Sequence, residues 1–178
     1  MYEGFMQAKT VEQTVVSKKA LLTMLSVAGA LIIPMMGFSQ SVTGTLVNFI
    51  LFATAMTVSA DSAIIAGSFS ATSALMKGAL FGPFTAAIAP MIPFIIMGNA
   101  LMVITYSLLK RVHPLVGIAA GSLLKFSFLY VMAHTIVTRQ VALPQPILIA
   151  MSYPQLLTAL TGGVVAYLFF RRAADSNR

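Results

Sequence analysis

Long apolar runs separated by short polar turns dominate this chain. The apolar runs occupy residues 20–38, 44–60, 63–75, 86–111, 115–137 and 151–170. An apolar helix of about 20 residues crosses the roughly 30 Å hydrocarbon core of a bilayer. The pattern therefore predicts an all-α integral membrane protein with six transmembrane helices. Because the third run is short and rich in Ser, Thr, Ala and Gly, we expect neighbouring helices to pack closely around it.

The polar stretches divide the chain into an N-terminal segment, residues 1–19, a membrane domain, 20–170, and a short tail, 171–178. Within the N-terminal segment, residues 10–16 could form a short helix at the membrane surface. Glycine and proline predict a loop at 77–85, and two prolines predict an ordered loop at 139–150. The membrane domain is the folded unit in this interpretation.

Basic residues indicate the orientation of the helices. In a six-span arrangement most of them lie near segment ends on one side: Lys9, Lys18, Lys19, Lys110, Arg111, Arg171, Arg172 and Arg178. Lys77 and Arg139 lie on the other side, and Lys125 lies within the membrane. Since Lys and Arg concentrate in cytoplasmic segments, we expect both termini to be cytoplasmic. Five spans would put the two most basic ends on opposite sides.

Composition agrees with a membrane protein and excludes several classes of function. Hydrophobic residues make up 58% of the 178 residues and charged residues only 8%, far below the usual quarter for a soluble domain. The net charge of +7 is not clustered with aromatic residues as in a nucleic-acid site. Cysteine is absent, so neither a disulfide nor a thiolate metal site is expected.

The sequence contains no recognisable catalytic constellation. Its acidic residues are Glu3, Glu12, Asp61 and Asp175, which provide neither a Ser-His-Asp set nor a zinc cluster. A phosphate-binding glycine loop followed by lysine is also missing. We therefore expect a protein that is not an enzyme, that needs no cofactor of its own, and that relies on other subunits for energy if it transports a solute.

Seven polar residues in or near the apolar runs are candidates for a binding site. Asn99 lies in the middle of the fourth run, where lipid offers its amide no hydrogen-bond partner. The other candidates are Asn48, Lys125, Tyr130, His134, Tyr153 and Gln155. Most lie at mid-membrane or in the outer half of the predicted bundle, which indicates a pocket that opens outward. A packing bond for Asn99 and an interfacial anchor for Tyr153 are the structural alternatives.

Helical spacing constrains how these residues point. Tyr130 and His134 are four residues apart and share one helix face, whereas Lys125 lies about half a helical turn from His134. Lys125 and His134 therefore cannot both point into one pocket. No acidic residue lies at the depth of Lys125. A ligand carboxylate or phosphate, backbone carbonyls at a helix break, or a partner subunit could satisfy its charge.

Small residues spaced four apart predict close helix contacts. They form the pairs Ser26 and Ala30, Ala159 and Gly163, and Gly162 and Ala166. These positions can serve internal packing, or they can form a face on which another membrane subunit docks.

Three stretches resemble the substrate-binding S component of energy-coupling factor transporters: GTLVN at 44–48, PFIIMGNALMV at 93–103 and PQLLTALTGG at 154–163. The resemblance implies a subunit of a vitamin importer with an outward-facing pocket. It also implies docking onto a transmembrane coupling (T) subunit and two ABC ATPases, which use the ATP. By this resemblance Asn99, Tyr130, His134, Tyr153, Gln155 and the loop at 77–85 belong to the pocket. The nearest match to the family's coupling motif is Ser26-x-x-x-Ala30.

The expected function is capture of a vitamin or vitamin precursor at the plasma membrane of a prokaryote. The pattern is most similar to S components for cobalamin or related corrinoids, with riboflavin or another vitamin as the alternative. A structural subunit of a membrane complex and a channel that works alone are the competing interpretations. Co-purification with coupling and ATPase subunits would favour the transporter.

Overall fold

The computed structural model describes residues 2–75 and 82–176, and every regular element in these ranges is helical. In chain order they are α1 (Tyr2–Met35), α2 (Gln40–Thr57), α3 (Ala60–Ser73), the 3-10 helix η1 (Gly82–Met91), α4 (Ile92–Leu109), α5 (Pro114–Val131), the π-helical turn η2 (Met132–Val137), α6 (Thr138–Gln140), α7 (Gln145–Ala150) and α8 (Tyr153–Ser176). The predicted all-α class is confirmed for this part of the chain.

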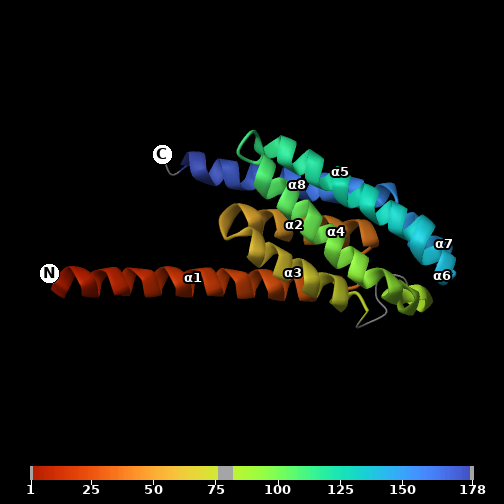
Figure 1. The fold of residues 1–178 in the computed structure, drawn as a ribbon, viewed down its shortest axis with the longest axis horizontal. Helices are drawn as coiled ribbons and strands as arrows, with labels where there is room; N and C mark the ends of the chain where they lie inside the picture. The colour runs from red at the N-terminus through yellow and green to blue at the C-terminus, as the bar shows by residue number, and fades with distance from the viewer. Residues whose placement is uncertain (1, 76–81, 177–178) are drawn as a thin grey trace.

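The long helices α1, α2, α3, α4, α5 and α8 form an elongated bundle in which consecutive helices reverse direction (Figure 1). The start of α1 and the end of α8 lie at the same end of the bundle, together with the α2–α3 and α4–α5 turns. We call this the terminal end. The α1–α2 turn, η1, α6 and α7 lie at the opposite, distal end.

The connections explain where several helices begin. The hydroxyl of Ser59 accepts a hydrogen bond from the backbone N–H of Ser62 at 3.2 Å, which caps the start of α3. His113 caps α5 in the same way, and Pro114 follows as its first residue, where a missing N–H costs nothing. Gly37 has a φ of 75° in the turn after α1, a conformation that side chains with a Cβ rarely adopt.

Several boundaries differ from the expected ones. Helix α1 is continuous from Tyr2, so residues 10–16 do not form a separate short helix. The chain has no glycine or proline between Phe5 and Ala28, and nothing there interrupts the helix. Part of the expected loop at 77–85 belongs to η1, and its residues 77–81 lie outside the described ranges. The expected loop at 139–150 contains α7.

Four helical stretches are long and apolar enough to cross a bilayer: Thr14–Met35, Phe84–Leu109, Pro114–Gln140 and Gln145–Arg171. This is the character of a multi-pass membrane protein. Helix α3 has 14 residues, and at 1.5 Å per residue it rises only about 21 Å. Its Ala63 and Ala66 are fully buried against other helices, as expected for a short helix made of small residues.

The apolar interior consists of two separate clusters. One lies toward the terminal end and includes Leu51, Phe52, Met102 and Val103. The other lies toward the distal end and is built from these buried residues: Ile88, Met91, Leu129, Ala133, Val137, Leu143, Ile147, Ala150 and Met151. Along α4, α5 and α8 the chain passes from one cluster to the other, and the buried residues between the clusters include polar ones: Asn99, Ser122, Lys125 and Thr158.

Small residues on α8 and α5 bring helix backbones into contact. A Cβ on Gly162 would lie 2.6 Å from the backbone oxygen of Thr45 on α2. A Cβ on Gly121 would lie 2.6 Å from the backbone oxygen of Met102 on α4. Ala159 and Ala166 are completely buried. The small-residue pairs of α8 therefore serve packing within this chain.

Candidate functional site

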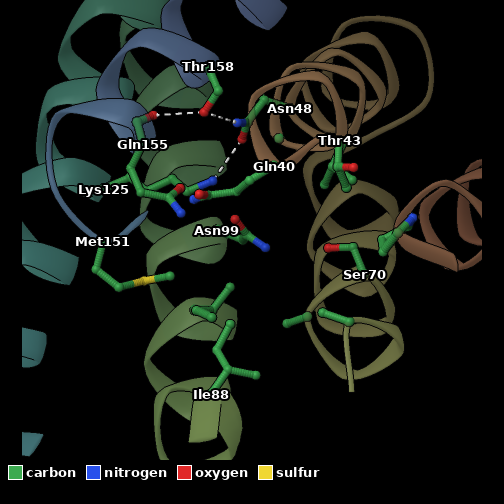
Figure 2. Close-up of a pocket in the computed structure, with 16 residues that line it drawn as sticks. Gln40, Thr43, Asn48, Ser70, Ile88, Asn99, Lys125, Met151, Gln155 and Thr158 are labelled. Carbon is green, nitrogen blue, oxygen red and sulfur yellow. Dashed lines mark hydrogen bonds between the residues drawn. The ribbon is translucent and has the colours of Figure 1, made fainter. Parts of the chain in front are cut away.

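A layer of buried polar side chains separates the two apolar clusters. Five helices each contribute one residue: Asn48 from α2, Ser70 from near the end of α3, Asn99 from α4, Lys125 from α5 and Thr158 from near the start of α8. Figure 2 shows that Asn48, Asn99, Lys125 and Thr158 converge on one region. The layer therefore depends on the packing of the whole bundle and on no single loop.

Hydrogen bonds connect the residues on one side of this layer. The Nζ of Lys125 donates to Oδ1 of Asn48 at 2.7 Å, and Nδ2 of Asn48 donates to Oγ1 of Thr158 at 3.4 Å. The Thr158 hydroxyl in turn donates to the backbone carbonyl of Gln155 at 3.3 Å (Figure 2). Because an ammonium can only donate, it fixes which end of the Asn48 amide faces it. The chain of bonds thus holds Lys125 in one position.

Asn99 lies across the layer from this chain of bonds and is only half satisfied. Its Nδ2 donates to the backbone oxygen of Gly67 on α3 at 3.1 Å. The two helices approach closely here, since a Cβ on Gly67 would lie 3.1 Å from the Cβ of Asn99. The Oδ1 of Asn99 is buried and has no hydrogen-bond partner. It is an available acceptor inside the bundle.

A cavity of about 90 Å³ adjoins this layer. Its lining comes from α1, α2, α3, η1, α4, α5 and α8: Pro34, Gln40, Thr43, Gly44, Val47, Asn48, Ser70, Ala71, Ala74, Ile88, Ile95, Asn99, Lys125, Met151, Gln155 and Thr158. These residues belong to the distal halves of their helices or to mid-length (Figure 1). The cavity therefore lies in the half of the bundle away from the termini.

Lys125 is the single charged residue of the lining. The side chain is 3% exposed, and an ammonium carries three hydrogens to donate. Its one hydrogen bond goes to Asn48, and the described lining contains no carboxylate. The amide oxygen of Asn48 thus accepts a hydrogen bond from one N–H group of the Lys125 ammonium. No described residue of the lining carries a negative charge that could balance it.

The structure brings together four of the seven site residues expected from sequence: Asn48, Asn99, Lys125 and Gln155. The aromatic candidates lie elsewhere. Tyr130 and His134 stack on each other with ring centroids 4.2 Å apart, and Tyr130 is 44% exposed. Tyr153 is 63% exposed. As helical spacing predicts, Lys125 and His134 do not share a pocket.

Four polar residues of the lining were not expected from sequence: Gln40, Thr43, Ser70 and Thr158. Ser and Thr in apolar helices commonly bond to their own backbone, as Ser70 does to the oxygen of Gly67, so their presence alone does not identify a site. The available signal for Thr158 was its spacing of three residues from Gln155, which places both on one face of α8.

Ser26 and Ala30, for which a docking role is expected, lie against another helix of this chain. Ala30 is completely buried within the chain, and the hydroxyl of Ser26 accepts a hydrogen bond from Oγ1 of Thr54 on α2 at 2.8 Å. The side chain of Ala30 is therefore enclosed in the bundle, whereas that of Ser26 is only partly buried. The small residues of α1 serve its packing against α2. The exposed face of α1 carries Leu21, Met24 and Leu25 instead.

A comparison with protein-family models, curated proteins and solved structures finds no match for this chain.

Proposed function

We propose that this protein is the solute-binding subunit of a membrane importer, of the kind represented by S components of energy-coupling factor transporters. The observation that supports this proposal most strongly is the buried polar layer. Five helices direct polar groups to one cavity at mid-length, and two of those groups lack full hydrogen-bond partners. Polar groups at such a depth are costly unless they bind one another or a solute.

The proposed topology has six spans and cytoplasmic termini. The positions of basic side chains support it, since Lys18, Lys19, Lys110, Arg111 and Arg171 belong to the terminal half of the bundle, whereas Arg139 lies at the distal end (Figure 1). In this orientation the cavity lies in the outer half of the membrane. Helix α3, too short to cross alone, would pack its small residues against its neighbours and present Ile65 and Phe69 to lipid.

In this proposal, partner subunits supply the energy for uptake. Solute release toward the cytoplasm requires rearrangement, because the terminal half of the bundle is filled by the cluster around Leu51, Phe52, Met102 and Val103. A coupling subunit and two ABC ATPases would drive that change in the plasma membrane of a prokaryote. The exposed apolar face of α1 is available for such contacts or for lipid.

Cavity size favours a compact solute. A volume of about 90 Å³ is small beside the 300–1,000 Å³ clefts that enclose drug-sized ligands, so even a small vitamin would have to widen it. A corrinoid would demand far more rearrangement. The aromatic candidates Tyr130, His134 and Tyr153, which could stack on a large ring system, lie outside the lining. A small vitamin or precursor therefore fits better than cobalamin.

Binding of radiolabelled vitamins to the purified chain in detergent, without partners, tests the proposal. The set should include cobalamin and riboflavin besides the small vitamins. We expect tight, saturable binding of one compact member. Folded protein that binds none of them would favour a structural subunit, and uptake by cells that lack the coupling and ATPase subunits would favour a channel.

A further inference from the structure

We propose that the cavity binds a compact monoanion, namely a carboxylic acid that also carries an N–H or O–H group. Its carboxylate would lie against the ammonium of Lys125, and its donor group would bind Oδ1 of Asn99. This inference rests on the proposed function and specifies the class of solute.

The uncompensated charge of Lys125 points to an anion. An ammonium that is 3% exposed, at mid-length of a helix long enough to span a membrane, requires either a counter-charge or several strong acceptors. Its hydrogen bond goes to one acceptor, the amide oxygen of Asn48, and the described lining contains no carboxylate. A purely structural lysine would be expected to have its remaining donors paired within the bundle. An anionic group of the solute would therefore accept the remaining hydrogen bonds of the Lys125 ammonium and balance its charge.

The number of cations in the cavity limits the charge of the solute. Among the described residues that line it, Lys125 is the single cation. A phosphate ester carries a charge of about −1.5 to −2 at neutral pH and usually needs several cationic or backbone donors. A carboxylate carries one negative charge and matches one ammonium. The chemistry of the lining therefore favours a carboxylate over a phosphate.

Asn99 adds a second requirement. Its Oδ1 is buried without a partner, and its Nδ2 is already held by the backbone of Gly67. The amide cannot simply rotate to exchange the two atoms, because Nδ2 would then lose its acceptor. A solute with an N–H or O–H group near its carboxylate would satisfy both Asn99 and Lys125. Simple fatty acids lack that group.

The surroundings make the two contacts selective. The hydrogen bonds from Lys125 through Asn48 to Thr158 hold the ammonium in place before a solute arrives. Apolar clusters on both sides, represented by Phe52 and Met151, limit the entry of water. In such a setting a charge-assisted hydrogen bond is stronger than in water, and an uncharged analogue is rejected.

Matched pairs of acids and uncharged analogues test the inference by equilibrium dialysis of the full chain in detergent. Suitable pairs are biotin with biotinamide and pantothenate with pantothenol, because each acid carries a carboxylate together with an N–H or O–H group. We expect one acid to bind saturably and its uncharged partner to bind roughly 10- to 100-fold more weakly, the usual effect of losing a hydrogen bond to a charged group.

Two variants separate the role of Lys125 from general electrostatic attraction. Lys125→Met should abolish the preference for the acid. Arg139→Met removes the same charge from an exposed site at the distal end and should preserve the preference. Equal binding of acid and uncharged partner, or a preference that survives in Lys125→Met, would overturn the inference while leaving solute capture intact. Folded protein that binds no member of any pair and no other vitamin would overturn both proposals.

Discussion

At the scale of single residues, the site depends on polar groups whose hydrogen bonds are incomplete. Asn48 and Thr158 are satisfied within the protein and orient Lys125, whereas Asn99 keeps a free acceptor. We therefore expect Asn48 and Thr158 to hold the ammonium of Lys125 in position, and Lys125 and Asn99 to contact the solute.

Replacement of Asn99 tests its contact with the solute. In Asn99→Leu the acceptor is lost, and we expect about tenfold weaker binding, equivalent to roughly 1.4 kcal/mol. The fold should persist, because the backbone oxygen of Gly67 loses only a bond from a side chain. Dialysis with the bound vitamin measures the affinity, and circular dichroism checks the helix content.

Tyr153→Leu provides the control for that experiment. Tyr153 is 63% exposed and lies outside the cavity lining, so its replacement should leave the affinity unchanged. Unchanged binding in Asn99→Leu would remove Asn99 from the solute site and leave it a packing role. Weaker binding in Tyr153→Leu would show that the exposed aromatic residues take part after all.

The residues of the site were predictable from sequence to different degrees. Asn48, Asn99 and Lys125 were identifiable because strongly polar groups are rare in apolar helices. Which face each helix turns inward was not predictable, because these helices carry apolar residues on all sides. Tyr130 and His134 were therefore expected in the pocket although their rings stack outside it.

At the scale of helices, close packing depends on small residues in specific positions. Ala30 on α1 is fully buried, and the α8 glycines lie against the α2 backbone and the side chains of Phe52 and Ile118. Sequence predicted close contacts at these pairs, but spacing alone did not distinguish internal packing from docking. The folded bundle shows which helix of this chain each of these small residues faces, and spacing in the sequence does not.

Enlargement of Ala30 tests this packing role. Ala30→Leu should destabilise the protein by about 1–3 kcal/mol, because extra side-chain volume must enter a filled contact. Ala28→Leu places the same side chain on the same helix at an exposed position and should have little effect. Unfolding in detergent followed by circular dichroism measures both.

The comparison between the two variants decides whether Ala30 has another role. If Ala30→Leu were as stable as the parent protein but no longer associated with a coupling subunit, the position would serve docking after all. That result would mean that the contact between α1 and α2 opens in the transporter.

At the scale of the whole molecule, six apolar runs predicted six membrane-spanning helices; each run corresponds to a helix, and four helical stretches are long and apolar enough to cross a bilayer. Their boundaries were less predictable. The continuous α1 has 34 residues and is about 51 Å long at 1.5 Å per residue, well beyond the thickness of a hydrocarbon core. Hydropathy identifies the part of a helix that prefers lipid, whereas α1 itself extends beyond that part to Tyr2 and ends just before the turn at Gly37.

The absence of cysteine makes the proposed orientation directly testable. Val112→Cys at the terminal end and Ala142→Cys at the distal end both replace exposed side chains in turns. A maleimide that cannot cross membranes should label the Ala142→Cys variant in intact cells, and the Val112→Cys variant only after the membrane is opened. The reverse pattern would turn the cavity toward the cytoplasm and contradict capture from outside.

Native mass spectrometry of the detergent-purified protein shows whether the polar cavity of this chain holds a solute. After incubation with the panel of vitamins, we predict one added small molecule per chain, lost on activation, and absent when the chain carries both Asn99→Leu and Lys125→Met. A folded chain that shows only its own mass throughout, or a solute retained equally by that double variant, would contradict the account.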